Sequence, residues 1–322
     1  MTRPKLTPGG RKAIRYVGTA VILLVVGYLF YRALAENWTQ VQEQHLGFTW
    51  LYVAAVVIFA IAVPVSGLLW GQIVNRLSPG PRAGIRESMA VHSASWLLKY
   101  IPGQVGSLVN KVAWGQKKGL SRTLMIITFI YENVFLQLAS IIPSVVIILL
   151  TVGIVVFEGN PVTLLLPLLA LVPLIAVLDR RIFHRLMSLA ANRILKQPLP
   201  EEYFLRTKFT ALYLAEFVIP RIINGAGFVL IAAAIMDVPP SLWLYFGAAY
   251  VLAGAIGILA VFVPSGLGVR EGVIVAVLLA VNIEPAQAVI LALLSRLLST
   301  IGDALVALIY GGLRLSLAKD PS

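Results

Sequence analysis

The sequence predicts an all-α polytopic membrane protein, built as an inverted-topology repeat with about three spans and one re-entrant helical hairpin in each half. The composition is apolar, with 59% hydrophobic residues, 12% charged residues and a mean hydropathy of +0.90, whereas soluble domains carry about 25% charged residues. Two segments interrupted by Pro and Gly stand about half a chain apart, and basic residues gather in short stretches between apolar runs. We therefore expect a single membrane domain over residues 1–322, with residues 1–160 as the first repeat and 161–322 as the second.

The composition also excludes several classes of function. The chain has no cysteine, which rules out disulfides, thiolate metal sites and cysteine nucleophiles. Its histidines, His45, His92 and His184, stand alone without metal-binding spacing, and we assign them structural or surface roles. The net charge of +12 does not indicate nucleic acid, because the basic residues flank apolar spans as the positive-inside rule describes. No metal, cofactor or nucleic-acid partner is expected.

The N-terminal half is predicted to hold three spans and one hairpin. Basic residues before the first span place the N-terminus in the cytoplasm. A cleaved signal peptide is the alternative for that span, but its apolar region is long for one. The segment broken at Pro102 and Gly103 has basic residues on both sides, so it enters and leaves on one face. In chain order we expect spans at about 16–35 and 50–74, a hairpin with a first arm at about 88–101 and a second arm ending near Lys111, and a span at about 123–150.

The C-terminal half is predicted to repeat this order from the opposite face. Its spans lie at about 162–178, 209–236 and 286–313, and its broken segment runs from 243 to 263, meets Pro264 and continues briefly after Gly272. Since the basic residues also place the C-terminus in the cytoplasm, this hairpin must enter and leave from outside. Residues 181–195 put arginines on one side and apolar residues on the other, which predicts an interfacial amphipathic helix. This helix is either a connector on the membrane surface or a site of lipid regulation.

The two interrupted segments are the most informative feature of the chain. They read YIPGQVG at 100–106 and FVPSGLG at 262–268, and their prolines are 162 residues apart, close to half of 322. A matched pair of broken helices is typical of transporters. Hairpin tips of opposite orientation can approach each other at mid-membrane depth, where protein or a wet cavity must satisfy their non-helical backbone. The alternative is that these glycines only allow close helix packing.

Ionisable residues inside apolar segments are the next candidates. Each costs about 2.5–3.5 kcal/mol at the bilayer centre on insertion scales, so such residues are functional candidates by default. Cations at half-helix ends suit a phosphate or another anionic headgroup, and carboxylates beside them could neutralise the empty site or carry protons. The alternative is internal ion pairing, of Arg296 with Asp303 and of Glu216 with Arg221. The predicted substrate-binding residues are Lys99, Pro102, Gly103, Lys111, Glu132, Glu216, Arg221, Pro264, Gly266, Gly268, Arg270, Glu271, Arg296 and Asp303.

At these residues the chain resembles a known family. Residues 264–272, PSGLGVREG, are similar to the Pro-x-Gly-x-Gly-x-x-Glu signature of the integral-membrane flippase-like family typified by the transmembrane region of lysylphosphatidylglycerol synthases. Residues 99–106 resemble the family's first-half element, and the similarity in span order covers nearly the whole chain. The resemblance implies translocation of a lipid or lipid-linked headgroup, with a site near Arg270, Glu271 and Arg296. Because the chain ends at Ser322 without a soluble aminoacyl-transferase domain, we do not expect lysyl transfer.

We therefore predict a non-enzymatic lipid flippase or transporter in the bacterial cytoplasmic (inner) membrane, working by alternating access. The chain lacks a G-x-x-x-x-G-K-[ST] phosphate-binding loop, so ATP hydrolysis is not its own energy source. Its expected partner is an anionic membrane lipid or a polyprenyl-phosphate-linked substrate. Two alternatives stay open: a membrane-embedded lipid-modifying transferase with Glu271 or Asp303 as base, and a partner subunit of a lipid-synthesis enzyme.

Overall fold

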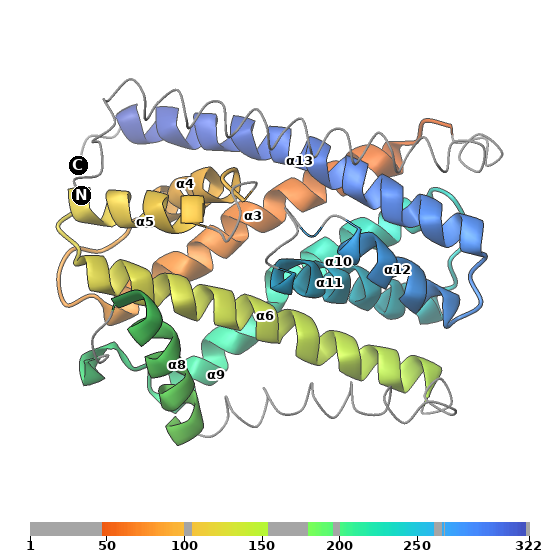
Figure 1. The fold of residues 1–322 in the computed structure, drawn as a ribbon. Coiled ribbons are helices and arrows are strands. Elements are labelled where there is room, and N and C mark those ends of the chain that lie inside the picture. Colours follow the sequence, from red (N-terminus) through yellow and green to blue (C-terminus); the bar gives the residue numbers. More distant parts are fainter. Residues whose placement is uncertain are drawn as a thin grey trace, which may run out of the picture.

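The computed structural model describes residues 47–99, 105–153, 180–195, 200–260, 266 and 268–319. All regular structure in these residues is helical (Figure 1). The elements are α3 (Trp50–Leu77), α4 (Ile85–Trp96), α5 (Val105–Lys117), α6 (Arg122–Val152), α8 (Arg180–Leu195), η3 (Glu201–Tyr203), α9 (Thr207–Glu216), α10 (Val218–Ala233), η4 (Pro240–Leu242), α11 (Trp243–Leu259), α12 (Val269–Leu279) and α13 (Pro285–Lys319).

Within the described residues, five segments are long and apolar enough to cross a membrane. Four of them confirm predicted spans, and these are Trp50–Leu77, Arg122–Val152, Glu201–Ala233 and Pro285–Ala318. The fifth, Pro240–Leu259, covers the first arm of the second predicted hairpin. That arm alone has the length of a span, which the sequence analysis did not anticipate. The predicted spans at about 16–35 and 162–178 lie outside the described residues.

The span predicted at about 209–236 is not one continuous helix. α9 ends at Glu216 and α10 begins at Val218, so the break falls at Phe217. Pro220 lies in the first turn of α10, and a proline ring clashes with the carbonyl group four residues earlier, here that of Glu216. The Phe217 ring is fully buried and lies 5.8 Å from the ring of Phe135 in α6. The sequence therefore breaks the helix, and packing against α6 holds the broken ends together.

Two long helices begin at side-chain caps that the sequence supplies. Thr49 Oγ1 accepts the Leu51 N–H at 3.4 Å before α3, and Ser121 Oγ accepts the Leu124 N–H at 3.0 Å before α6. A hydroxyl at this position satisfies one of the backbone donors that the first helical turn leaves unpaired. The starts of α3 and α6 are thus fixed by local chemistry before any packing.

Two large clusters of buried apolar side chains organise the described residues. One joins the second half of α3 to α6 and to residues of α4, α8 and α9, and the other joins the first half of α3 to α10, α11, α12 and α13. α3 therefore passes through both clusters, while α13 and α6 run along opposite sides of the molecule (Figure 1). α4 and α5 pack against the first of these clusters, whereas α11 and α12 contribute to the second.

Candidate functional site

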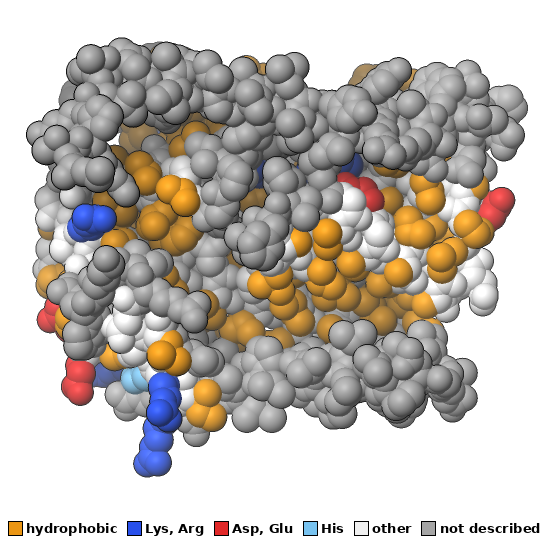
Figure 2. Space-filling model, in the orientation of Figure 1, with side chains coloured by type: hydrophobic (Ala, Val, Ile, Leu, Met, Phe, Trp, Pro, Cys, Tyr) orange, Lys and Arg blue, Asp and Glu red, His pale blue; other side chains and the backbone are white. Residues whose placement is uncertain are grey.

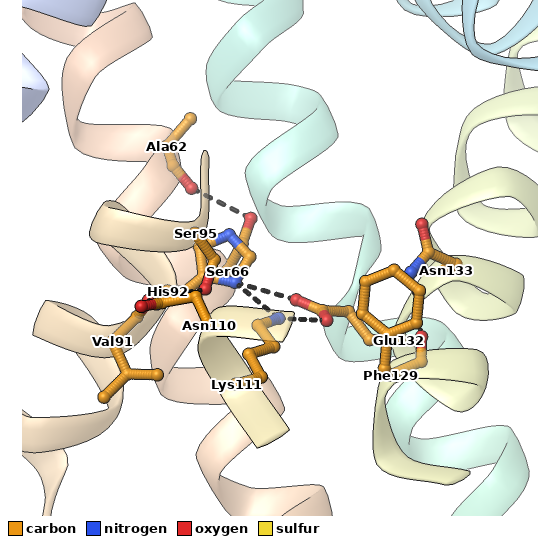
Figure 3. Close-up of polar contacts among 10 residues, drawn as sticks. All are labelled: Ala62, Ser66, Val91, His92, Ser95, Asn110, Lys111, Phe129, Glu132 and Asn133. Atoms are coloured by element: carbon orange, nitrogen blue, oxygen red, sulfur yellow. Dashed lines mark hydrogen bonds and ion pairs between the residues drawn. The ribbon is translucent and has the colours of Figure 1, made fainter. Parts of the chain in front are cut away.

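Three polar side chains meet where α4, α5 and α6 pack together (Figure 3). Lys111 Nζ of α5 donates to Glu132 Oε2 of α6, and it lies 3.3 Å from Nδ1 of His92 in α4. The same His92 nitrogen is 2.8 Å from Glu132 Oε1. We call His92, Lys111 and Glu132 the buried triad. It joins two predicted site residues to a histidine that the sequence analysis set aside.

The buried triad is closed to its surroundings. The side chains of Lys111 and Glu132 are 1% and 2% exposed, and the ammonium group also lies 4.5 Å from the centre of the Trp70 ring. Nearby, Asn110 Nδ2 donates to Ser95 Oγ at 2.9 Å, which ties α5 to α4 (Figure 3). One ammonium and one carboxylate cancel, so the triad links three helices and leaves no surplus charge to bind a ligand.

A second group joins the end of α4 to α13, two elements far apart in the sequence. Lys99 Nζ lies 2.8 Å from Asp303 Oδ1 and 2.7 Å from Oδ2, and Trp96 Nε1 donates to Oδ1 at 2.8 Å. Asp303 is 8% exposed. Pairing with Arg296 on the same helix was the alternative to a binding role for Asp303, and the structure shows that Asp303 contacts Lys99 in the first half of the chain.

The start of α12 carries the third group. Glu271 Oε2 accepts the Gly268 N–H at 2.8 Å, and its Oε1 lies 3.7 Å from Arg296 Nη1 of α13. The Arg270 guanidinium carbon lies 4.3 Å from the centre of the Tyr250 ring of α11. Among the described residues, Nε and Nη2 of Arg270 are buried without a hydrogen-bond partner. Within the described part of the chain, this arginine therefore has unpaired donors that are shielded from solvent.

The second and third groups form one electrostatic site. Arg270 and Arg296 are both close enough to Lys99 to repel it, whereas Asp303 attracts it. We call these side chains the mixed-charge cluster: Lys99, Arg270, Glu271, Arg296 and Asp303. It contains one more cation than carboxylate and draws on the turn after α4, on α12 and on α13. An anionic group would balance that excess, and the Arg270 donors that have no partner in the described residues could bind its oxygens.

Comparison with known proteins identifies the family of this chain. Residues 15–307 match the family described as lysylphosphatidylglycerol synthase TM region. The chain belongs to this family. A search of curated proteins finds no match to this chain. Membership confirms the resemblance drawn from the sequence and makes this a multi-pass membrane protein of a family linked to lipid modification.

The other predicted site residues of this family member are placed as follows. Arg221 of α10 is close enough to act electrostatically on His92 and Tyr250, but among the described contacts no ion pair joins it to Glu216. Gly266 and Gly268 shape the backbone before α12, with φ of +66° and +78°. Pro102, Gly103 and Pro264 lie outside the described residues.

Sequence reasoning missed His92 and Tyr250. Ser88, His92 and Ser95 are all buried and follow one face of α4 at helical spacing, so this polar seam was a signal that could have selected the histidine. Tyr250 carried no such signal. Its ring stacks against those of Phe59 and Phe228, with centroids 5.2 and 5.1 Å away. Only the packing of α3, α10 and α11 brings these aromatic rings together beneath Arg270.

The chain also contains a second copy of the helix start that carries Arg270. Gly84-Ile85-Arg86-Glu87 opens α4 as Gly268-Val269-Arg270-Glu271 opens α12, and each glutamate accepts the N–H of the glycine three residues earlier, at 3.2 and 2.8 Å. A glutamate at this position caps a helix. The cap therefore explains the glycine and the glutamate in both copies. The arginines differ, because Arg86 is exposed whereas Arg270 has buried, unpartnered donors among the described residues.

Proposed function

We propose that this protein is a lipid flippase, which binds the anionic headgroup of a membrane lipid or lipid-linked carrier at the mixed-charge cluster and moves it across the bilayer. The observation that carries the proposal is the excess of cations over carboxylates at a site where Arg270 also has donors without a partner among the described residues. Charge-assisted hydrogen bonds from arginine to phosphate are strong and geometrically specific. The headgroup occupies the cluster while its acyl chains stay in the bilayer.

The lengths of the short helices support the proposed route. α4 and α5 have 12 and 13 residues, which gives each a length of about 18–20 Å, short of the roughly 30 Å hydrocarbon core. α4 therefore fits the first arm of a re-entrant hairpin, with Lys99 just beyond its end. Lys99 contacts Asp303 in the other half of the chain. In the proposed mechanism an incoming headgroup competes with Asp303 for Lys99, and the two halves rock to alternate access.

The two copies of the Gly-x-Arg-Glu helix start provide a matched test. We would compare Arg270→Gln with Arg86→Gln in proteoliposomes, measuring translocation of fluorescently labelled phosphatidylglycerol and phosphatidylcholine by reduction of the label from outside. Loss of one charged hydrogen bond to the headgroup should slow phosphatidylglycerol translocation by about tenfold or more in Arg270→Gln. Arg86→Gln removes the same group after the same cap, and it should stay close to the wild type.

Equal rates for the two variants would contradict the proposed role of Arg270. Wild-type protein that translocates no faster than protein-free liposomes would contradict the flippase itself. The test also reports on the transferase alternative. If lipid chromatography shows a new product while the label stays in its original leaflet, the mixed-charge cluster serves lipid modification instead.

A further inference from the structure

The amphipathic helix α8 lies apart from the mixed-charge cluster and is anchored on one face. Met187 is 1% exposed and belongs to the apolar cluster that contains α6, and the His184 ring stacks on Phe204 with centroids 4.0 Å apart. In Figure 1, α8 crosses the direction of α6 instead of running along it. A helix that lies across a membrane-spanning helix, near its end, has the orientation of a helix in the plane of the membrane surface.

The opposite face of α8 combines exposed apolar and basic side chains. Ile182 and Leu189 are 44% and 58% exposed, and Arg185 lies between them at helical spacing, with exposed Arg181 beside them. α8 contains four arginines and no acidic residue. Figure 2 shows Lys and Arg side chains projecting at the place of α8, next to hydrophobic ones. Exposure of two large aliphatic side chains to water on one helix face is unfavourable, and such a surface marks an interaction site.

We propose that α8 binds anionic phospholipids at the membrane surface, at a site distinct from the transport cluster. The helix belongs to a membrane-spanning chain, so a bilayer surface is the partner always within its reach. Aliphatic side chains enter the boundary between acyl chains and headgroups, while the arginines bind the phosphates above it. Arg122 at the start of α6 adds exposed positive charge to a helix that packs with α8. The occupant is thus a lipid with a negatively charged headgroup, retained at the surface and not transported.

The test counts bound lipid on the full-length protein. We would titrate detergent-solubilised protein with phosphatidylglycerol and with phosphatidylcholine, and follow binding by native mass spectrometry. The double variant Arg181→Gln/Arg185→Gln should weaken phosphatidylglycerol binding by about 25-fold, since each arginine near an anionic surface contributes roughly fivefold. The control Arg82→Gln/Lys117→Gln removes two exposed charges that lie outside α8 and α6, and it should retain most of the bound lipid.

A second readout measures insertion directly. A Leu189→Trp variant in nanodiscs that contain phosphatidylglycerol should show indole fluorescence that brominated acyl chains quench, and quenching should fall when phosphatidylcholine replaces the anionic lipid. Absence of quenching, equal loss of binding in the control double variant, or preferential binding of RNA or an acidic peptide by α8 would each overturn the proposal. Because Arg270→Gln should retain this surface lipid, failure here is distinguishable from failure of the flippase proposal.

Discussion

The two halves of the chain carry an ion pair at matching places, with the charges exchanged. In the first half the cation is on α5 and the carboxylate on α6, as Lys111 and Glu132, and in the second the carboxylate is on α12 and the cation on α13, as Glu271 and Arg296. A shift of 162 residues, the spacing of the two prolines, carries the first pair to within two residues of the second. Direct identity between the halves is weak, so the proposed duplication rests on order, spacing and charge. The positions of these two pairs add to that argument.

The environments of the two pairs differ more than their positions. The first pair is 1% and 2% exposed, touches a third partner in His92, and is balanced. The second pair is 8% and 17% exposed, its atoms are 3.7 Å apart, and Arg270 and Lys99 add positive charge to it. We infer that the same arrangement has two uses. In this proposal the sealed, neutral pair holds helices together, whereas the looser pair with surplus charge exchanges one partner for a ligand.

The largest expected effect separates the two pairs by stability. Lys111→Met strands the Glu132 carboxylate in the interior, and breaking a buried pair on one side costs about 3–5 kcal/mol. Arg296→Met should cost clearly less, because Glu271 keeps its bond from the Gly268 N–H and the cluster loses one of the two arginines that repel Lys99. Unfolding in mixed micelles, followed by circular dichroism, measures both variants.

A double variant checks the assignment of the first pair. Lys111→Met/Glu132→Leu removes both charges and should recover much of the stability that Lys111→Met loses, since an apolar replacement of a buried pair is often neutral or stabilising. Comparable losses for Lys111→Met and Arg296→Met would contradict the division into a structural pair and a binding pair.

The next effect concerns the backbone that presents Arg270 and Glu271. Gly266 and Gly268 both have positive φ, but a Cβ at Gly266 would lie 2.6 Å from the Gly257 Cα, whereas a Cβ at Gly268 would meet nothing within 4 Å. Gly268→Ala should therefore cost only the conformational strain, about 1–2 kcal/mol. Gly266→Ala should cost more and should also slow translocation, because it displaces the start of α12. Thermal unfolding of the two variants makes the comparison, and equal losses would mean that close packing on α11 does not matter.

Periodicity and charge placed the elements but not their partners. The long apolar runs predicted α3, α6 and α13 because about twenty apolar residues suffice to identify a span, and the alternation of arginine with aliphatic residues predicted α8. The same reasoning gave Arg296, on the same helix, as the alternative partner of Asp303, because a single sequence gives the spacing along one helix and not the register between two. Lys99 becomes its partner only through the packing of α4 against α13. The break at Phe217, in contrast, was readable from Pro220 and was missed because the apolar run continues through it.

The smallest expected effect concerns Glu87, in the copy of the helix start that opens α4. Burial raises the pKa of Glu87, but bonds from Lys118, Trp114 and the Gly84 N–H together hold that pKa below its ordinary range. Glu87 lies outside the five candidate spans, and its side chain is 24% exposed. A depressed folded-state pKa stabilises the fold above the unfolded-state value near 4.3, and this contribution is lost as the pH falls through the lower, folded-state value.

Wild-type protein should therefore lose up to about 1 kcal/mol more than Glu87→Gln between about pH 5 and pH 3, since partly exposed pairs contribute little. Thermal unfolding of both proteins across that range provides the measurement. Parallel curves would show that Glu87 adds no pH-dependent stability. A difference confined to this window would show that the α4 copy of the cap is a structural ion pair, which leaves binding of the headgroup to the α12 copy.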